Sequence, residues 1–149
     1  MKMLVRLPAL CFIGVLIAGS TALGYYYLYV YGPPLEAAER FMNAMEAGDA
    51  PALADTILVS AGRDGNELRE PDDEILGSLL EESFDRGRIL DQRKREGPER
   101  AFHYLVYREP DGQVYALVVA EVDGRYRVVI PEVAMSERHL YLWDYAWTN

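Results

Sequence analysis

Histidine titrates near neutral pH, which makes it the side chain best suited to general acid–base catalysis. The chain contains two histidines, and His103 is the better candidate for a catalytic base. It shares one face of a predicted strand with Leu105 and Tyr107, and this apolar setting is typical of a histidine held by structural hydrogen bonds. We therefore interpret His103 as a structural residue.

The other reactive residues form no catalytic motif. His139 is close in sequence to Ser136 and Asp144, but proximity in sequence does not by itself pair a nucleophile with a base. The acidic run 72–74 could attract a cation, yet the helix dipole already favours acidic residues where a helix begins. The sequence has no glycine-rich phosphate loop and no cluster of cysteines and histidines. We predict no catalytic residue, no cofactor, no metal site and no enzymatic activity.

Basic residues concentrate in one short region, which includes residues 86–88 and 93–95. The region stands out because the chain around it is acidic. A solvated strand face is the ordinary interpretation of such a run. Contact with an acidic partner is the alternative.

Aromatic residues concentrate in the C-terminal tail, residues 134–149, which contains both tryptophans. Large aromatic side chains are rarely left exposed near a chain end, so the tail is predicted to be buried. Two alternatives remain open: the tail folds back over the mouth of its own domain, or it docks on a partner. The candidate docking residues are Tyr141, Trp143, Tyr145 and Trp147.

The N-terminal residues 1–32 are predicted to form a membrane anchor, which precedes all the residues considered so far. The uncharged stretch from Leu7 to Tyr31 supplies the ~20 apolar residues that a membrane helix needs. Basic residues precede this stretch and acidic residues follow it, so the N-terminus is predicted in the cytoplasm and the domain in the periplasm or another extracytoplasmic space. A signal peptide cleaved after Gly24 is the alternative. Apolar character continues beyond Gly24, which favours a retained anchor.

Two features of the anchor suggest further contacts. Gly14, Ala18 and Ala22 recur every four residues, so they share a helix face that a second helix can approach closely. A cluster of tyrosines, a ring type that settles at membrane interfaces, is predicted to form a belt. The belt consists of Tyr25, Tyr26, Tyr27, Tyr29 and Tyr31. The following pair, Pro33–Pro34, is predicted to end the helix.

The charge balance excludes one class of partner. The net charge is −9, and because Lys2 and Arg6 are the only charged residues of the anchor, the remainder carries −11. So acidic a domain is unsuited to nucleic acid and is expected to be repelled from anionic lipid. Cys11 is the only cysteine, so the exported domain has no disulfide and depends on its apolar core.

The domain, residues 33–133, changes from helical to strand periodicity along its length. The predicted helices, two or three in number, cover residues 35–45, 49–58 and 72–87. The predicted strands cover residues 88–96, 101–108, 113–122 and 125–130. Helices followed by a meander indicate an α+β fold, in which the helices pack on a curved antiparallel sheet of about four strands.

The segment 41–49, followed by Leu53, resembles the opening of the NTF2-like (cystatin-like) superfamily, in which a helix ends in Gly-Asp before a second helix. The segment 115–129 resembles the closing hairpin of that superfamily. The resemblance covers residues 35–133 and implies a cone whose mouth can hold a ligand. The superfamily includes isomerases, dehydratases and non-catalytic docking modules, and no catalytic motif of its enzymes is matched here.

The sequence therefore predicts a single-pass protein of the cell (inner) membrane. We expect a non-catalytic accessory or assembly subunit of a larger membrane complex, with the membrane and other membrane-protein subunits as its partners. The first alternative is a membrane-tethered domain that binds a small apolar ligand. The second is an enzyme of the isomerase or dehydratase type.

Overall fold

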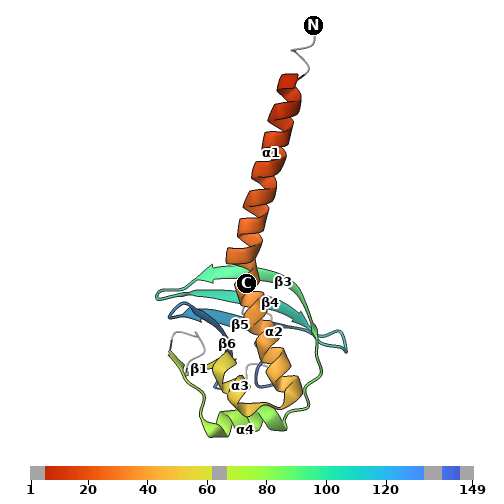
Figure 1. Ribbon diagram of the computed structural model, residues 1–149. Helices are drawn as coiled ribbons and strands as arrows, with labels where there is room; N and C mark the ends of the chain where they lie inside the picture. The colour runs from red at the N-terminus through yellow and green to blue at the C-terminus, as the bar shows by residue number, and fades with distance from the viewer. Residues whose placement is uncertain (1–5, 62–66, 133–138, 145–149) are drawn as a thin grey trace. The chain divides into compact units, whose positions relative to one another are not determined.

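The computed structural model describes residues 6–61, 67–132 and 139–144, and the side chains of these residues except 6–12, 29 and 30. The chain divides into two compact units, Met1–Pro33 and Pro34–Asn149. The first unit is helical, and the second is an α+β domain (Figure 1).

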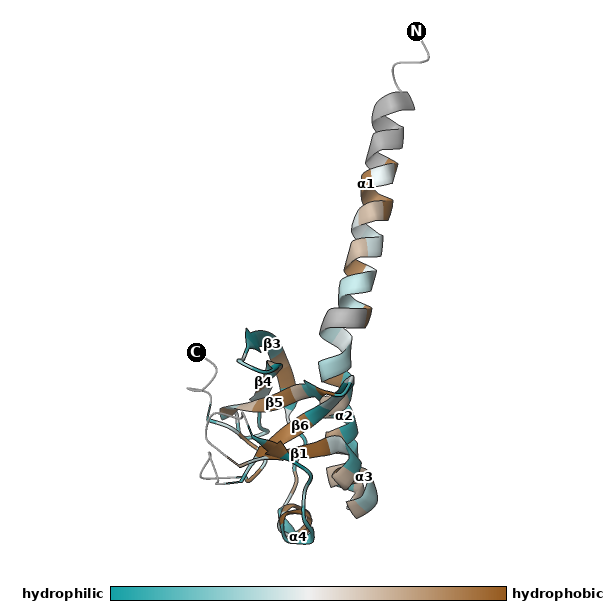
Figure 2. Cartoon of the chain, turned by 90° about the vertical axis from the view of Figure 1, so that its left-hand side faces the viewer, coloured by the Kyte–Doolittle hydropathy of each residue, from teal (hydrophilic) through white to brown (hydrophobic). Residues whose placement is uncertain are grey.

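The first unit consists of helix α1, Arg6–Tyr25, and a π-helical segment η1, Tyr26–Tyr31. The 20 residues of α1 extend over about 30 Å, the thickness of the hydrocarbon core of a bilayer. Figure 2 shows brown and tan residues along α1 interspersed with pale and pale-teal ones. Among the described residues, one helix near the N-terminus is long and apolar enough to cross a membrane.

The prediction that Pro33 and Pro34 end the helix is wrong, because helix α2, Gly32–Ala47, contains both residues. Proline lacks an N–H, which is tolerated in the first turn of a helix because the N–H groups there have no partner within the helix. The preceding segment is also wound more widely: the N–H of Gly32 bonds to the carbonyl of Tyr27, five residues earlier. The two prolines therefore lie where the regular pattern of hydrogen bonds between residues i and i−4 is already interrupted.

The second unit contains α2 and a sheet of six strands in the order β2-β1-β6-β5-β4-β3. Its other elements are α3 (Ala50–Thr56), β1 (Ile57–Ser60), β2 (Leu68–Arg69), α4 (Asp73–Glu81), β3 (Arg88–Glu96), β4 (Ala101–Arg108), β5 (Val114–Val122) and β6 (Arg125–Pro131). The part of α2 that belongs to the second unit crosses the strands (Figure 1).

The α+β fold is confirmed, but the expected antiparallel sheet of about four strands is wrong in two respects. Strands β1 and β2 were not predicted, and β1 pairs in parallel with β6, so the sheet is mixed. Residues 57 and 58, assigned by the sequence to a helix, begin β1 instead. All four residues of β1 are buried, and such a short apolar run has no alternation to distinguish it from a buried helix.

The third predicted helix is also shorter than expected, because α4 ends at Glu81 rather than at Gly87. Asp72 caps its start by accepting a hydrogen bond from the N–H of Ile75 at 2.9 Å. Glu82 leaves the helical conformation, and its carboxylate accepts a hydrogen bond from the backbone of Leu140. A contact with a distant segment therefore accompanies the early end of α4.

Local features of the sequence set several other boundaries. Gly48 has φ +61° at the end of α2, and Asp49 accepts a hydrogen bond from the N–H of Ala52 at the start of α3. Asp123 and Gly124 have φ of 53° and 74°, the left-handed values that a tight hairpin turn requires. These positions set where α2, α3 and the β5–β6 hairpin meet.

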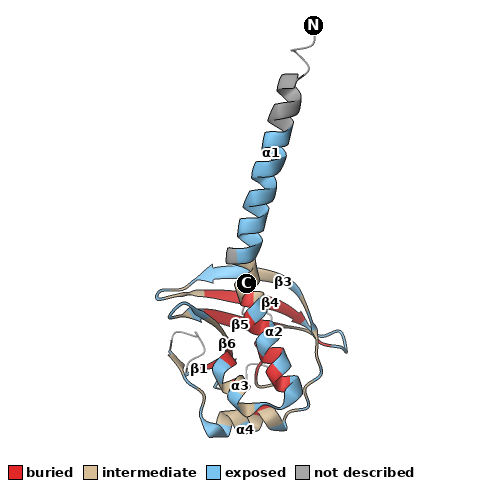
Figure 3. Cartoon of the chain, viewed as in Figure 1, coloured by how far each residue is buried: buried red, intermediate tan, exposed pale blue. Residues whose placement is uncertain are grey.

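Buried residues are concentrated in α2 and the central strands (Figure 3). Apolar side chains are buried on both faces of the sheet. The larger cluster lies on the face covered by the helices and includes Phe41, Leu53, Leu79 and Leu117. A smaller cluster lies on the opposite face and includes Phe102, Val118, Val129 and Trp143. We call the side away from the helices the outer face.

Gly87 lies where the chain has no room for a side chain. A Cβ there would lie 2.3 Å from the carbonyl oxygen of Arg108 and 2.5 Å from Cζ of Tyr107. We predict that Gly87→Ala lowers the free energy of unfolding by about 1–3 kcal/mol, because backbone and ring must both move. Urea unfolding of the full chain in detergent, followed by circular dichroism, measures the change.

Gly77 provides the matched control, since a Cβ there meets nothing within 4 Å and the residue is exposed in α4. Gly77→Ala is expected to raise the free energy of unfolding by about 0.5–1 kcal/mol, because alanine favours the helix. Changes of the same sign at both glycines would contradict the packing described for Gly87.

Candidate functional site

Residues 139–144, the tail segment, pass from one face of the sheet to the other beside β5. Trp143 forms an antiparallel bridge with Ala116, through two backbone hydrogen bonds of 2.9 Å each. Tyr141 and Leu142 belong to the cluster under the helices, whereas Trp143 belongs to the cluster on the outer face. The tail segment therefore contributes to both cores.

Tyr141 is fully buried between the helices and the sheet. Its ring centroid is 5.6 Å from that of Phe41 and 5.8 Å from that of Phe84, both in tilted contact. On the outer face, the indole N–H of Trp143 donates to the carbonyl of Val129 at 2.8 Å. Such a partner is what a buried indole requires.

His139 lies between two glutamates and fixes the start of the tail segment. Its Nδ1 is 3.2 Å from Oε2 of Glu82, and its Nε2 is 2.9 Å from Oε1 of Glu109. The side chain of Glu109 is only 3% exposed. The other oxygen of Glu82 accepts a hydrogen bond of 2.8 Å from the N–H of Leu140. The imidazole also stacks on the ring of Tyr141, with centroids 5.0 Å apart.

The chemistry available to His139 is limited by this arrangement. Each ring nitrogen already faces a carboxylate, so neither is open to accept a proton from a substrate. The carboxylates lie at different nitrogens and do not converge with the ring on a common point. Among the described residues, no group of three acidic, histidine or cysteine side chains has the arrangement of a metal site. The cluster is suited to holding the tail segment in place.

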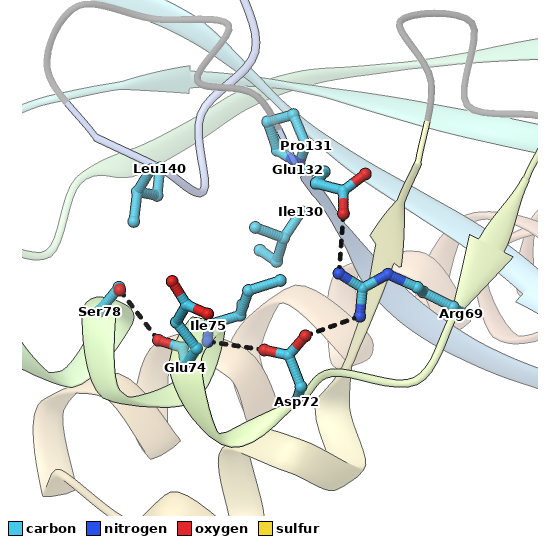
Figure 4. Close-up of a pocket in the computed structure, with 9 residues that line it drawn as sticks. All are labelled: Arg69, Asp72, Glu74, Ile75, Ser78, Ile130, Pro131, Glu132 and Leu140. Atoms are coloured by element: carbon cyan, nitrogen blue, oxygen red, sulfur yellow. Dashed lines mark hydrogen bonds and ion pairs between the residues drawn. The ribbon is translucent and has the colours of Figure 1, made fainter.

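A surface hollow of about 280 Å³ lies beside the tail segment (Figure 4). It is lined by Arg69, Asp72, Glu74, Ile75, Ser78, Ile130, Pro131, Glu132 and Leu140. Arg69 binds Asp72 at 3.0 Å and Glu132 at 2.9 Å, so its guanidinium is engaged on both sides. The hydrogen bond to Glu132 and then that to Asp72 raise the pKa of Arg69. The carboxylates of the hollow outnumber its single cation, and Arg69 bridges α4 to the end of β6.

Asp72 has a structural explanation within this hollow. The N–H of Ile75 and then the guanidinium of Arg69 lower the pKa of the Asp72 carboxyl, so it is ionised at neutral pH. One carboxylate oxygen caps α4, and the other binds Arg69. The run 72–74 thus acts as the capped helix start that the sequence indicated.

His103, the residue considered as a base, is buried on the helix-covered face of β4. Its Nδ1 lies 3.2 Å from Nε2 of Gln92, and its ring meets Tyr126 edge-on with centroids 5.7 Å apart. Burial, and then the positive charge of Lys94, lowers the pKa of His103 below its usual value near 6.5. The imidazole is therefore neutral at pH 7 and packed against its neighbours.

The residues of the basic region have two different environments. Arg86 binds Glu46 at 2.8 Å and also Glu39, and it donates to Oδ1 of Asn43 at 3.0 Å. These contacts join α2 to the segment before β3. The remaining basic residues, from Arg88 onward, project from the edge strand β3, most of them exposed to solvent.

The anchor residues singled out by the sequence lie in the first unit. Gly14, Ala18 and Ala22 are exposed on α1, and a Cβ at Gly14 would meet nothing within 4 Å. Tyr25, Tyr26 and Tyr27 are exposed as well. Tyr31 packs against two of them, with centroids 6.3 Å from Tyr26 and 5.9 Å from Tyr27. The side chain of Tyr29 lies outside the described residues.

The candidate docking residues of the tail divide into two pairs. Tyr141 and Trp143 are buried in their own domain, so they are not exposed anchors. Tyr145 and Trp147 lie outside the described residues. The partners of His139 were missed by the sequence reasoning, because Glu82 and Glu109 are far from it in sequence and no local spacing connects them.

No protein-family model matches the chain, and no curated protein matches it.

The burial of Trp143 leads to a graded stability prediction. Trp143→Ala should lower the free energy of unfolding, followed by circular dichroism, by about 3–5 kcal/mol. Trp143→Phe keeps an aromatic ring but leaves the Val129 carbonyl without its donor, and about 1–3 kcal/mol is expected. Urea unfolding measures both. A loss below 1 kcal/mol for Trp143→Ala would contradict the packing of the tail segment.

The lowered pKa of His103 predicts a pH dependence with a definite sign. The unfolded chain binds a proton near pH 6.5 and the folded chain only at lower pH, so protonation favours unfolding in this window. Stability should be greatest above pH 6.5 and should fall as the pH is lowered towards the folded pKa. Urea midpoints at pH 7.5, 6.5 and 5.5 measure the effect, and His103→Gln should flatten the profile. An unchanged slope in that variant would assign the effect to another group.

Proposed function

We propose that the chain is a single-pass membrane protein whose extracytoplasmic domain serves as a non-catalytic accessory or assembly subunit of a larger membrane complex. The observation that carries the proposal is the exposure of α1. Its large aliphatic side chains Ile13, Val15, Leu16, Ile17 and Leu23 are between 51% and 71% exposed. So much exposed apolar surface requires lipid or a partner helix to cover it.

The proposed orientation rests on charge. Lys2 and Arg6 precede the apolar stretch, and the acidic domain follows it, which favours a cytoplasmic N-terminus. The small residues Gly14, Ala18 and Ala22 offer the face on which a partner helix could pack closely. The tyrosine cluster is suited to the outer interface of the bilayer.

The domain is proposed to be an NTF2-like docking module. Two helices followed by the long strands β3–β6, with α2 lying across the sheet, agree with that architecture. In a cone of this kind a ligand would enter between helix and sheet. Tyr141 and Leu142 fill the core on that side, which favours a docking role over the ligand-binding alternative.

The enzymatic alternative has less support. His103 is neutral and packed against Tyr126, and both nitrogens of His139 face carboxylates. A catalytic base must reach the proton that it removes. Neither imidazole presents a nitrogen towards a cavity described above.

Purification from native membranes in mild detergent tests the proposed function. We expect partner subunits in constant stoichiometry, identified by mass spectrometry. Gly14→Ile should reduce their recovery at least several-fold, because a bulky side chain prevents close helix approach. A chain recovered only as a monomer would overturn the proposal.

Gly19→Ile is the matched control for this experiment. Gly19 lies on the same helix, a Cβ there also meets nothing within 4 Å, and five residues separate it from Gly14, which places it on a different face. The control should retain the partners. Equal loss with both variants would show that added bulk, rather than the small-residue face, is responsible.

A further inference from the structure

Strand β3 forms one edge of the sheet and places its arginines on one face. Arg88 pairs with Arg108 of β4, Arg93 pairs with Tyr104, and Arg95 pairs with the outer-face residue Phe102. Directly paired residues of antiparallel strands share a face. We call Arg88, Arg93, Arg95 and Arg108 the arginine edge; it lies on the outer face.

An irregularity in β3 makes this arrangement possible. Arg88 and Arg93 are five residues apart, so in a regular strand they would point to opposite faces. The register shifts between Ile89 and Asp91, and this bulge brings both arginines to the outer face. The same bulge contains Leu90, which is 46% exposed. Among the described residues of the second unit, Leu90 alone is a strongly exposed large apolar residue.

Three of the four arginines of the edge have no carboxylate partner among the described residues. Within the described parts of the chain, Arg88, Arg95 and Arg108 form no ion pair, and Nε of Arg93 is 3.8 Å from Oδ2 of Asp91. Like charges directly opposite each other, as at Arg88 and Arg108, destabilise a sheet. Cations therefore gather, at a cost to stability, on one edge of a chain whose net charge is −9.

The arginine edge lies on the side of the second unit on which the chain of that unit begins. The part of α2 that belongs to the second unit runs across the sheet from the side of β3 (Figures 1 and 2). Three peptide units separate Tyr31, where the apolar stretch ends, from Pro34, where the second unit begins, and they can span at most about 10 Å. The start of α2 is thus tethered within about 10 Å of the end of the apolar stretch.

We propose that the arginine edge and Leu90 bind the anionic phosphodiester headgroups of the membrane that α1 spans, and so hold the domain against the bilayer. This inference rests on the proposed membrane anchorage and goes beyond the proposed docking role. Guanidinium groups pair with phosphate through two parallel hydrogen bonds, and Leu90 adds an apolar contact below the headgroups. The acidic remainder of the domain does not prevent this contact, because salt screens charges over about 10 Å.

The full chain in lipid nanodiscs tests this inference. In a Cys11→Ala background, Leu90→Cys carries an environment-sensitive fluorophore, and spin-labelled lipid quenches it on contact. We expect quenching in nanodiscs with 30% phosphatidylglycerol, and its loss in pure phosphatidylcholine or in 0.5 M NaCl. Arg88→Gln with Arg95→Gln should lower the ratio of bound to unbound domain by about 30-fold, at ~1 kcal/mol for each arginine near the surface.

Arg125→Glu is the matched control, because it changes the net charge by the same two units. Arg125 lies on β6, three strands from β3 in the sheet order, and it binds Asp55 at 2.7 Å. This control should leave the quenching unchanged. Equal effects of the two variants, or quenching that is the same without anionic lipid, would overturn the inference.

Three further outcomes separate this inference from the proposed function. If the chain co-floats with vesicles but the fluorophore is never quenched, headgroup binding fails while membrane anchorage stands. Shielding of the fluorophore only in the complex purified from native membranes would assign the arginine edge to an acidic protein partner instead. If the chain does not float with vesicles, both the anchorage and the inference fail.

Discussion

The packing of Tyr141 between Phe41 and Phe84 holds together parts of the domain that are far apart in the sequence. Phe41 belongs to α2, Phe84 follows α4, and Tyr141 reaches them from a segment bridged to β5. The domain has no disulfide, so apolar contacts of this kind must provide most of its stability. This core also positions the polar groups around it. His139 lies two residues before Tyr141, and Glu82, at the end of α4, binds the backbone of the tail segment.

Features with a local cause could be predicted from the sequence. The caps at Asp49 and Asp72, the left-handed turn at Asp123 and Gly124, and the apolar face of α2 each depend on a few neighbouring residues. Strand β1 could not be predicted in this way, because its four buried residues become a strand only through parallel pairing with β6. The early end of α4 likewise accompanies a contact between Glu82 and Leu140, which is 58 residues away.

The candidate sites likewise divide into features that the local sequence predicts and features that depend on distant contacts. Composition identified a basic region and an aromatic tail, and periodicity identified His103 as structural. The face on which the arginines lie depends on a register shift at one point in β3, and the burial of Trp143 depends on a bridge to Ala116. Net charge also gave an incomplete picture of the surface. A domain that is acidic as a whole still carries a cationic edge. Successive side chains of a strand point to opposite faces of the sheet, and the extra residue of a bulge reverses this alternation for the residues that follow.

The tail segment has a consequence for biogenesis. Residues 141–143 follow every described strand and helix in chain order, yet they supply part of both cores. Both apolar clusters therefore lack part of their side chains until this segment has left the ribosome. With the export proposed above, the domain would complete its cores only after these residues had crossed the membrane, which suits a translocation route for extended chains. The order of synthesis thus places three residues that both cores require after all the other residues described in those cores.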